Sequence, residues 1–411
     1  MNLTQRLIAW LPKFDRRIWI LIVGRLLSQM GTGFILFYAP IFFVNQVGLS
    51  AALVGIGIGS ESVTGVIGRI LGGSLADSPQ WGRRKTLLLA AAFSAAADFV
   101  LAVSYNFPTF LIGNLLMGMG VGLYWPSAES LVADLAPIEQ RNEAFALNRL
   151  ADSLGLSLGV ALGGGWIAAT GAYRALFVVD SVSFIVFFAI VYKAIRETVK
   201  PQSGNTALQG WTTALRDRPL QVYIIANSLF TTYLALISSA LPLYFTNFVA
   251  GGFNSVRISG LFVWHIALAA LCQLPVARWL NEMRRPKALM LSAGFWAIGF
   301  LLVRLTGAVP SHQLLWAGLS LAVMAIATVS YTPSASSLVV ELAPESARGV
   351  YLSINSLCWA AGYFVGPVLG GWALSQSPSV ANNFWIGVAA SVIATIAILQ
   401  GLDRLLQSER R

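Results

Sequence analysis

The stretch YWPSAESLVADLAP, residues 124–137, recurs as YTPSASSLVVELAP at residues 331–344. The two copies are 207 residues apart, which is about half of the 411-residue chain. When the alignment is extended to residues 164 and 371, 18 of its 41 positions are identical, including a pair of glycines at the end of each copy. The chain is therefore expected to contain two similar halves.

The composition indicates that both halves lie in lipid. Hydrophobic residues make up 56% of the chain and charged residues only 11%, and the mean hydropathy is +0.71. Soluble globular proteins carry about 25% charged residues, so this composition cannot supply a water-exposed surface. A spanning helix needs about 20 apolar residues. Twelve such helices account for the chain, which predicts an all-α membrane protein of two parallel six-helix repeats.

The hydrophobic segments also define the expected domains. We place the twelve spans at residues 18–44, 49–76, 85–105, 108–136, 144–169, 174–193, 219–248, 257–280, 286–306, 312–342, 349–374 and 382–403. The resulting domains are a cytoplasmic or interfacial segment at 1–17, an N-terminal bundle at 18–193, a cytoplasmic linker at 194–218, a C-terminal bundle at 219–403 and a cytoplasmic tail at 404–411.

The distribution of basic residues indicates the topology. Lysines and arginines gather at the two ends of the chain and in the even-numbered connections, and only Arg174, Arg257 and Arg304 fall on the other predicted side. Cytoplasmic connections of membrane proteins carry such an excess of basic residues, so both termini are expected in the cytoplasm. The net charge of +10 therefore reflects topology. It does not predict a nucleic-acid partner.

Three local motifs lie within or next to the predicted spans. GGSLADSPQWGRRK at Gly72–Lys85 is similar to the motif that follows the second span in the major facilitator superfamily. LIGNLLMGMGVG at 111–122 resembles the motif of the fourth span, with Asn114 at the position where the family usually has arginine. GYFVGPVLGG at 362–371, matched by GLSLGVALGG at 155–164, resembles the glycine-proline motif of drug:proton antiporters. Parallel six-helix repeats are typical of the same family.

The resemblance covers the whole chain and implies a function. It is closest to the twelve-span drug:proton antiporter branch, which implies proton-coupled export of a small amphipathic compound by alternating access. The expected location is the inner membrane of a prokaryote, and the expected state is a monomer. Uptake or uniport of a polar nutrient, such as a sugar or an organic anion, remains an alternative, as does a solute sensor that does not transport. The sequence predicts no enzyme and no cofactor, and two histidines and two scattered cysteines make no metal site.

The resemblance also assigns roles on the cytoplasmic side. It implies a charge clasp after the second span, formed by Gly73, Asp77, Gly82, Arg83 and Arg84. In this clasp the glycines let helices approach closely, and the aspartate and the arginine pair supply the charges.

Ionisable residues within the spans are costly, at about 2.5–3.5 kcal/mol each on insertion scales. At the rise of an α-helix, Arg25, Arg69, Glu129 and Arg149 all lie about 10–12 Å from the cytoplasmic ends of their spans. Together with Asp152 they form an intramembrane charge layer. This layer is either a structural ion cluster or a site of coupling or anion binding. Because three bases surround it, Glu129 is also a candidate for proton coupling.

Glu61 differs from this layer because it lies near the middle of its span with no obvious basic partner. Burial disfavours the charged form of a carboxyl group, so Glu61 is the leading candidate for a proton carrier. The alternative is a permanently protonated glutamate that hydrogen-bonds to serine or threonine. Asp98 and Asp180 fall on the third and sixth spans, which are peripheral in the family, and we expect structural roles for them.

Polar and aromatic residues within the spans are candidates for the substrate cavity, although such residues also pack helices together. A histidine in this set could equally be a structural, hydrogen-bonded one. The candidates are Gln29, Tyr38, Asn114, Tyr124, Trp125, Asn148, Asn227, Tyr233, His265, Gln273, Tyr331 and Asn355.

Glycines repeat every fourth residue in spans 5 and 11. Gly155, Gly159 and Gly163 correspond to Gly362, Gly366 and Gly370, and Pro367 interrupts the second set. Four residues make just over one helical turn, so each set lines one helix face and permits close packing. Tight packing alone explains the pattern, and so does a smooth face along which the halves move against each other.

Overall fold

The computed structural model describes residues 14–78, 80–135, 141–197, 214–280, 282–344 and 348–409. Within these residues, twelve helices are long and apolar enough to cross a membrane. Most of them coincide with the predicted spans to within a few residues. The apolar part of span 5 starts later than predicted, and those of spans 7 and 8 end earlier. The predicted all-α membrane fold is confirmed.

The first half contains α2 (Arg16–Ile35), α3 (Ala39–Asn45), α4 (Ala51–Asp77), α5 (Gly82–Ala102), α6 (Phe107–Leu135), α7 (Arg141–Thr170) and α8 (Tyr173–Ala194). The second half contains α10 (Arg218–Ser239), α11 (Leu241–Asn247), α12 (Ser255–Leu280), α13 (Arg285–Ala308), α14 (Gln313–Leu342), α15 (Arg348–Leu374) and α16 (Pro378–Glu409). The short α3 continues the crossing that α2 begins. The short α11 follows α10 in the same way.

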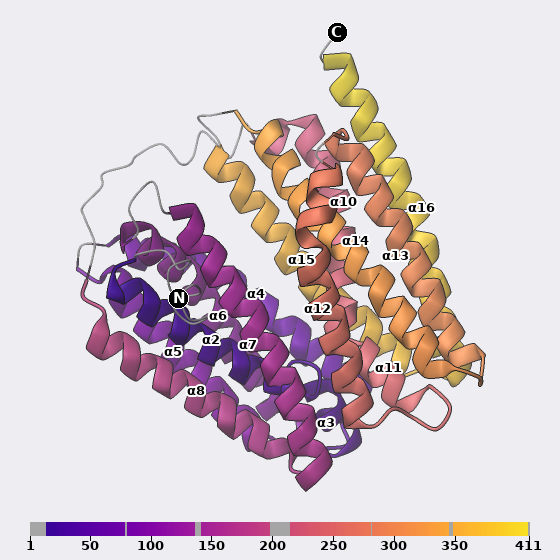
Figure 1. The fold of residues 1–411 in the computed structure, drawn as a ribbon, viewed down its shortest axis with the longest axis horizontal. Coiled ribbons are helices and arrows are strands. Elements are labelled where there is room, and N and C mark those ends of the chain that lie inside the picture. Colours follow the sequence, from indigo (N-terminus) through magenta and orange to yellow (C-terminus); the bar gives the residue numbers. More distant parts are fainter. Residues whose placement is uncertain are drawn as a thin grey trace, which may run out of the picture.

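The two halves pack their helices in the same pattern. In the first bundle α4 and α5 pack against α6, α2 packs against α7, and α5 packs against α8. The corresponding pairs of the second bundle are α12 and α13 with α14, α10 with α15, and α13 with α16. Figure 1 shows these bundles as separate bodies that lie side by side. The predicted duplication is therefore confirmed in the fold.

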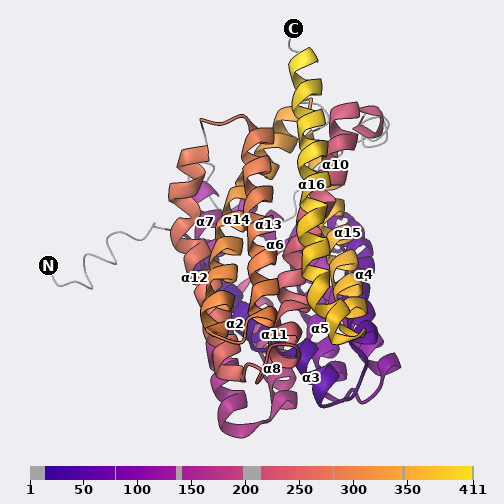
Figure 2. The same ribbon diagram turned by 90° about the vertical axis from the view of Figure 1, so that its right-hand side faces the viewer.

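Two pairs of helices join the bundles, and the repeat relates the pairs to each other. One pair is α4 with α15, and the other is α12 with α7. Twelve crossings place the start of α2 and the end of α16 on one side, which we call the terminal side. The short α3 and α11 contact each other at the opposite end of the molecule from the C terminus (Figures 1 and 2).

Glycines determine how closely these helices approach. A Cβ atom on Gly159 would lie 2.0 Å from the Met30 carbonyl oxygen of α2, so this glycine belongs to the packing inside the N-terminal bundle. Gly366 packs in the same way against Ala235 of α10. The contact between bundles uses a neighbouring glycine instead, because a Cβ atom on Gly371 would lie 2.3 Å from the Ala51 carbonyl oxygen of α4.

Candidate functional site

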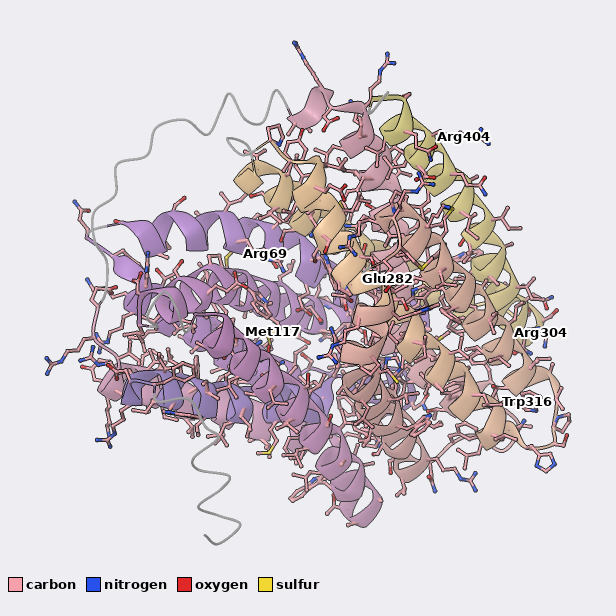
Figure 3. The ribbon with its side chains drawn as sticks, turned by 45° about the horizontal axis from the view of Figure 1, so that its top comes forward. Arg69, Met117, Glu282, Arg304, Trp316 and Arg404 are labelled. Atoms are coloured by element: carbon pink, nitrogen blue, oxygen red, sulfur yellow. The ribbon has the colours of Figure 1, made fainter. Side chains whose placement is uncertain are left out.

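A cavity of about 300 Å³ lies inside the N-terminal bundle, and residues of α2, α3, α4, α5, α6 and α8 line it. Ser238 and Ser239 of α10 also contribute to its wall. Most of the lining is apolar, and Met117, labelled in Figure 3, is part of it. The polar and charged side chains of the lining from the first bundle are Arg25, Ser28, Gln29, Thr32, Glu61, Ser94, Asn114, Tyr124, Trp125 and Asp180.

Four of the predicted cavity residues line this space. They are Gln29, Asn114, Tyr124 and Trp125. Asn114 donates a hydrogen bond from Nδ2 to the Phe110 carbonyl at 2.8 Å, one helical turn earlier. This bond fixes the amide and leaves its Oδ1 as an acceptor for other groups.

The guanidinium of Arg25 forms the charged part of the cavity wall. It makes an ion pair with Asp152 of α7, and the arginine is only 6% exposed. Its Cζ atom lies 4.4 Å from the ring centre of Tyr124 and 5.0 Å from that of Trp125. Cations are attracted to aromatic faces at such distances. The positive charge of the cavity is thus compensated inside the protein.

Arg69 lies where the two bundles meet. Its Nη1 donates a hydrogen bond to the Ser356 hydroxyl of α15, and the charge of Glu129 acts on its guanidinium. Glu129 itself is exposed. The charge layer therefore divides into an Arg25 centre inside one bundle and an Arg69 centre at the interface. Arg69 is labelled in Figure 3. The side chain of Arg149 lies outside the described part of the structure.

Glu61 lines the same cavity from α4. Within the described part of the chain it forms no ion pair. It is near enough to Asp98 and to Tyr363 of α15 for its charge to act on both. The backbone is held tightly here, because a Cβ atom on Gly118 of α6 would lie 2.0 Å from the Glu61 carbonyl oxygen.

Several other predicted residues form a hydrogen-bonded network inside the C-terminal bundle. Tyr331 donates to Asn227 Oδ1 at 2.6 Å, and Asn227 Nδ2 donates to Asn355 Oδ1 at 2.9 Å. Tyr223 donates to the same Asn355 oxygen at 2.7 Å. Asn227 and Tyr331 are each 1% exposed, so this network joins α10, α14 and α15 in the interior of the bundle.

The remaining predicted residues lie at separate places. Tyr233 hydrogen-bonds to Ser391 and Thr395 of α16. His265 Nδ1 lies 2.9 Å from the Leu321 carbonyl oxygen, which joins α12 to α14. Tyr38 bonds to Ser259 of the other bundle, Gln273 is exposed, and Asn148 is half-buried on α7.

The predicted clasp region contains one hydrogen-bonding partner that the sequence did not reveal. The Glu197 carboxylate accepts hydrogen bonds from the backbone amides of Arg83 and Arg84, at 2.8 and 3.2 Å, and so binds the start of α5. Gly82 has a φ of +83°, and a Cβ atom there would lie 2.3 Å from the Glu197 carboxyl carbon. Glu197 lies in the predicted linker and is the last residue that the structure describes before residue 214, and its sequence context carries no sign of this partner.

The two clasp arginines are also held by side-chain bonds. Arg83 makes an ion pair with Asp134 of α6 and donates to the Ser130 carbonyl at 3.0 Å. Arg84 donates to the Tyr192 carbonyl at 2.6 Å. A Cβ atom on Gly73 would meet nothing within 4 Å. The side chain of Asp77 lies outside the described part of the structure.

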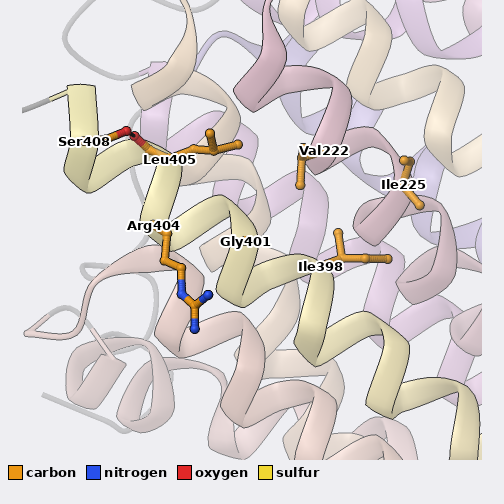
Figure 4. A pocket seen from close by; sticks show the side chains of 7 residues that line it. All are labelled: Val222, Ile225, Ile398, Gly401, Arg404, Leu405 and Ser408. Atoms are coloured by element: carbon orange, nitrogen blue, oxygen red, sulfur yellow. Dashed lines mark hydrogen bonds between the residues drawn. The ribbon is translucent and has the colours of Figure 1, made fainter.

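A second hollow, of about 610 Å³, lies between α10 and α16 near the terminal side (Figure 4). Val222, Ile225, Ile398 and Leu405 line it, and Arg404 and Ser408 are its polar residues. An apolar hollow with a single charge at one end has the character of a surface covered by lipid. It does not combine convergent polar groups as the cavity of the N-terminal bundle does.

Comparison with known proteins agrees with this architecture. A family model described as Major Facilitator Superfamily matches residues 21–264 and 235–404. The multidrug resistance protein MdtH of Shigella boydii serotype 4 (strain Sb227) is 27% identical over 369 residues, which cover 88% of this chain and 87% of that protein. MdtH of Escherichia coli (strain K12 / DH10B) is 26% identical over 369 residues, with the same coverage.

Solved structures show the same fold at lower sequence identity. The nucleoside transporter NupG superposes with a TM-score of 0.79 at 13% identity, over 94% of this chain and 99% of that one. The peptide transporter POT in complex with sulfate superposes with a TM-score of 0.80 at 14% identity, over 97% and 98% of the two chains.

Proposed function

Because the chain belongs to the major facilitator superfamily, it is a secondary transporter rather than an enzyme, and we propose that it exports small amphipathic compounds in exchange for protons. The proposed transporter acts as a monomer in the inner membrane of a bacterium, with its terminal side in the cytoplasm. Its two bundles rock about α4, α15, α7 and α12, so that the substrate site opens to each side in turn.

The chemistry of the cavity supports an amphipathic substrate. Ligand sites are commonly apolar clefts with a few placed polar groups and start at volumes of about 300 Å³. The cavity of the N-terminal bundle has about this volume, with aromatic and aliphatic walls and amides from Gln29 and Asn114. An apolar body would pack against the walls, and a polar or charged end would meet the amides or Glu61.

The direction of transport is supported by the relatives. The two MdtH relatives are named multidrug resistance proteins, and each match covers most of this chain and most of the relative. A transporter that confers resistance to a drug does so by removing it from the cell, so export is the direction that we propose for this chain as well.

Proton coupling is best supported by the position of Glu61. This carboxyl group is in the cavity wall, has no ion pair among the described residues, and lies on the helix that packs against α15 of the other bundle. Movement of the bundles would change its surroundings and hence its affinity for a proton. Glu129 is the second candidate, because it is exposed and close to Arg69 at the bundle interface.

A second candidate function is uptake or uniport of a polar nutrient. The observation in its favour is Arg25, a cation in the cavity wall that could bind an organic anion. Because Asp152 already neutralises this guanidinium, the cavity offers little net attraction to anions. We therefore favour export of amphipathic compounds.

The test uses purified protein in liposomes, with ethidium as a fluorescent amphipathic probe and DNA in the lumen to report its arrival. With an acidic lumen, molecules whose terminal side faces the medium should accumulate ethidium in the lumen faster than they do without a gradient. The Glu61→Gln variant should lose this gradient-driven part and keep downhill equilibration. Accumulation that ignores the pH gradient supports uniport, and binding without movement supports a sensor.

The matched control is Glu282→Gln, because Glu282 is exposed between α12 and α13 (Figure 3). It undergoes the same chemical change far from the cavity and should behave as the unaltered protein does. If Glu61→Gln accumulates ethidium at the rate of this control, the role proposed for Glu61 is wrong.

A further inference from the structure

Two aspartates on α5 and α8 lie against each other inside the N-terminal bundle. Asp98 and Asp180 are both 0% exposed, and their carboxyl groups are within hydrogen-bonding range of each other. Ser183 donates a hydrogen bond to Asp180 Oδ1 at 3.0 Å. Among the described residues, no other group bonds to either oxygen of Asp98 or to Asp180 Oδ2.

This arrangement favours a bound proton. Two adjacent carboxylates repel each other, and one of them must be neutral when they share a buried site. Each charge within a bilayer also has a high cost unless a partner compensates it. Within the described part of the chain, neither aspartate forms an ion pair with a basic residue. A proton on one carboxyl group supplies the donor that the unpartnered oxygens of the other lack.

The pair has a route to the cavity. Asp180 lines the cavity, so its carboxyl group contacts a space that is large enough for several water molecules. The charged and titratable groups that share this space are Glu61 of α4, Arg25 of α2 and Tyr124 of α6. Arg25 is already paired with Asp152, and Glu61 is near enough to act on Asp98. Glu61 is thus the group with which the pair can exchange a proton.

The surrounding packing holds the two carboxyl groups in place. Ser181, which follows Asp180 on α8, donates to the carbonyl of Ala95, one turn before Asp98 on α5, at 2.8 Å and joins the two helices beside the pair. Gly31 of α2 covers Asp180, because a Cβ atom there would lie 2.1 Å from Asp180 Oδ1 and 2.4 Å from the Ser183 hydroxyl. Because α2 approaches α8 so closely, any residue larger than glycine at position 31 would displace the Asp180 carboxyl group.

We propose that Asp98 and Asp180 form a second proton-binding site, which stores one proton and exchanges it with Glu61 through the cavity. The proton leaves a carboxyl O–H of the pair, crosses by way of cavity water and binds the Glu61 carboxylate, and no other bond changes. The role of this site in transport rests on the proposed proton coupling, whereas the binding of the proton does not.

Infrared difference spectroscopy on the full-length protein in liposomes tests the binding directly. Protonated buried carboxyl groups give a C=O stretching band that carboxylates lack. This band should change with pH in the unaltered protein and in Glu61→Gln, and a component of it should vanish in Asp98→Asn and in Asp180→Asn. The control is Asp403→Asn, whose carboxyl group pairs with Arg284 far from the cavity. If Asp98→Asn and Asp180→Asn retain the same band as this control, no proton is stored at the pair.

The ethidium assay then tests the role in transport. Asparagine has nearly the shape of a neutral aspartic acid, so the variants should keep their thermal stability. Asp98→Asn should lower gradient-driven accumulation severalfold and keep downhill equilibration. Equal loss of both activities, together with lower thermal stability, would mean a purely structural pair. Failure of the Glu61→Gln test with a normal infrared result would reject the proposed coupling and leave the proton site intact.

Discussion

Asp152 forms an ion pair with Arg25, the charged residue that α2 contributes to the cavity wall. Replacing Asp152 with alanine would leave Arg25, a residue that is only 6% exposed, without its counter-ion. Breaking a buried pair in this way costs about 3–5 kcal/mol, because a charge remains buried and uncompensated. We therefore expect Asp152→Ala to lower the thermal unfolding temperature strongly in detergent. The double variant Arg25→Met with Asp152→Leu should regain most of the loss.

The pair Arg284–Asp403 provides the comparison. Its nitrogen and oxygen are 3.0 Å apart, and the Arg284 side chain is 43% exposed. Exposed ion pairs contribute about 0–1 kcal/mol, so Asp403→Ala should leave the unfolding temperature nearly unchanged. If Asp152→Ala is as stable as Asp403→Ala, the Arg25 charge has another partner or remains hydrated.

Single residues show what sequence can and cannot predict. The depth of Arg25 and Asp152 in the bilayer follows from counting along their helices, and this placed both in one layer. Their pairing does not follow, because 127 residues separate them and Arg149 is only one turn from Asp152. The same limit applies to Asp98 and Asp180, for which we expected structural roles on two spans that are peripheral in the family. The structure places Asp180 in the cavity wall, since α5 and α8 turn their few polar residues inward.

The crossing of α2 and α7 depends on Gly159. A Cβ atom there would meet the Met30 carbonyl oxygen at 2.0 Å and Gly33 Cα at 2.8 Å, both of them backbone atoms. Gly159→Ala must push the two helices apart, and such overpacking costs about 1–3 kcal/mol. We expect a lower thermal unfolding temperature in detergent. Gly165 is the matched control, because a Cβ atom there meets nothing within 4 Å.

Alanine at position 165 of the same helix should be neutral or stabilising, since glycine costs up to about 1 kcal/mol relative to alanine inside a helix. Equal unfolding temperatures for Gly159→Ala and Gly165→Ala would show that α2 and α7 can separate at little cost. They would then not be the rigid pair that the structure indicates.

At the scale of helices, glycine spacing predicted close-packed faces in α7 and α15, and the structure has them. Spacing does not tell which helix such a face meets. Gly159 and Gly366 face α2 and α10 of their own bundles. Gly164 and Gly371, each the second glycine of an adjacent pair, face the other bundle. Any sliding contact between bundles therefore runs along the second glycine of each pair. Which helix a glycine faces depends on tertiary contacts, and a glycine at every fourth residue does not specify those contacts.

At the scale of the molecule, the repeat predicted two equivalent bundles, and pseudo-symmetric pairs of helices do join them. The conformation was not predictable, because one sequence must form every state of the transport cycle. In this state the side opposite the termini is closed by contacts across the bundles. Phe37 stacks on Phe262 with ring centres 3.9 Å apart, and Tyr38 bonds to Ser259.

The outermost of these contacts is a reciprocal amide pair between α3 and α11. Asn45 Nδ2 donates to Asn247 Oδ1 at 2.9 Å, and Asn247 Nδ2 donates to Asn45 Oδ1 at 2.8 Å. Alternating access requires the bundles to separate here, so a covalent link at this point should stop the cycle. We expect Asn45→Cys with Asn247→Cys, joined by a short reducible thiol reagent, to lose ethidium accumulation in liposomes and to regain it on reduction.

Several controls make this result specific. Cys272 and Cys358 are replaced first, so that the reagent can join only the introduced thiols. Each single cysteine variant, treated in the same way, should transport normally, because a thiol reagent on one bundle does not tie it to the other. Undiminished accumulation by the linked double variant would mean that the substrate crosses without opening at α3 and α11. The two bundles would then not exchange access by rocking, and the mechanism derived from their symmetry would have to be abandoned.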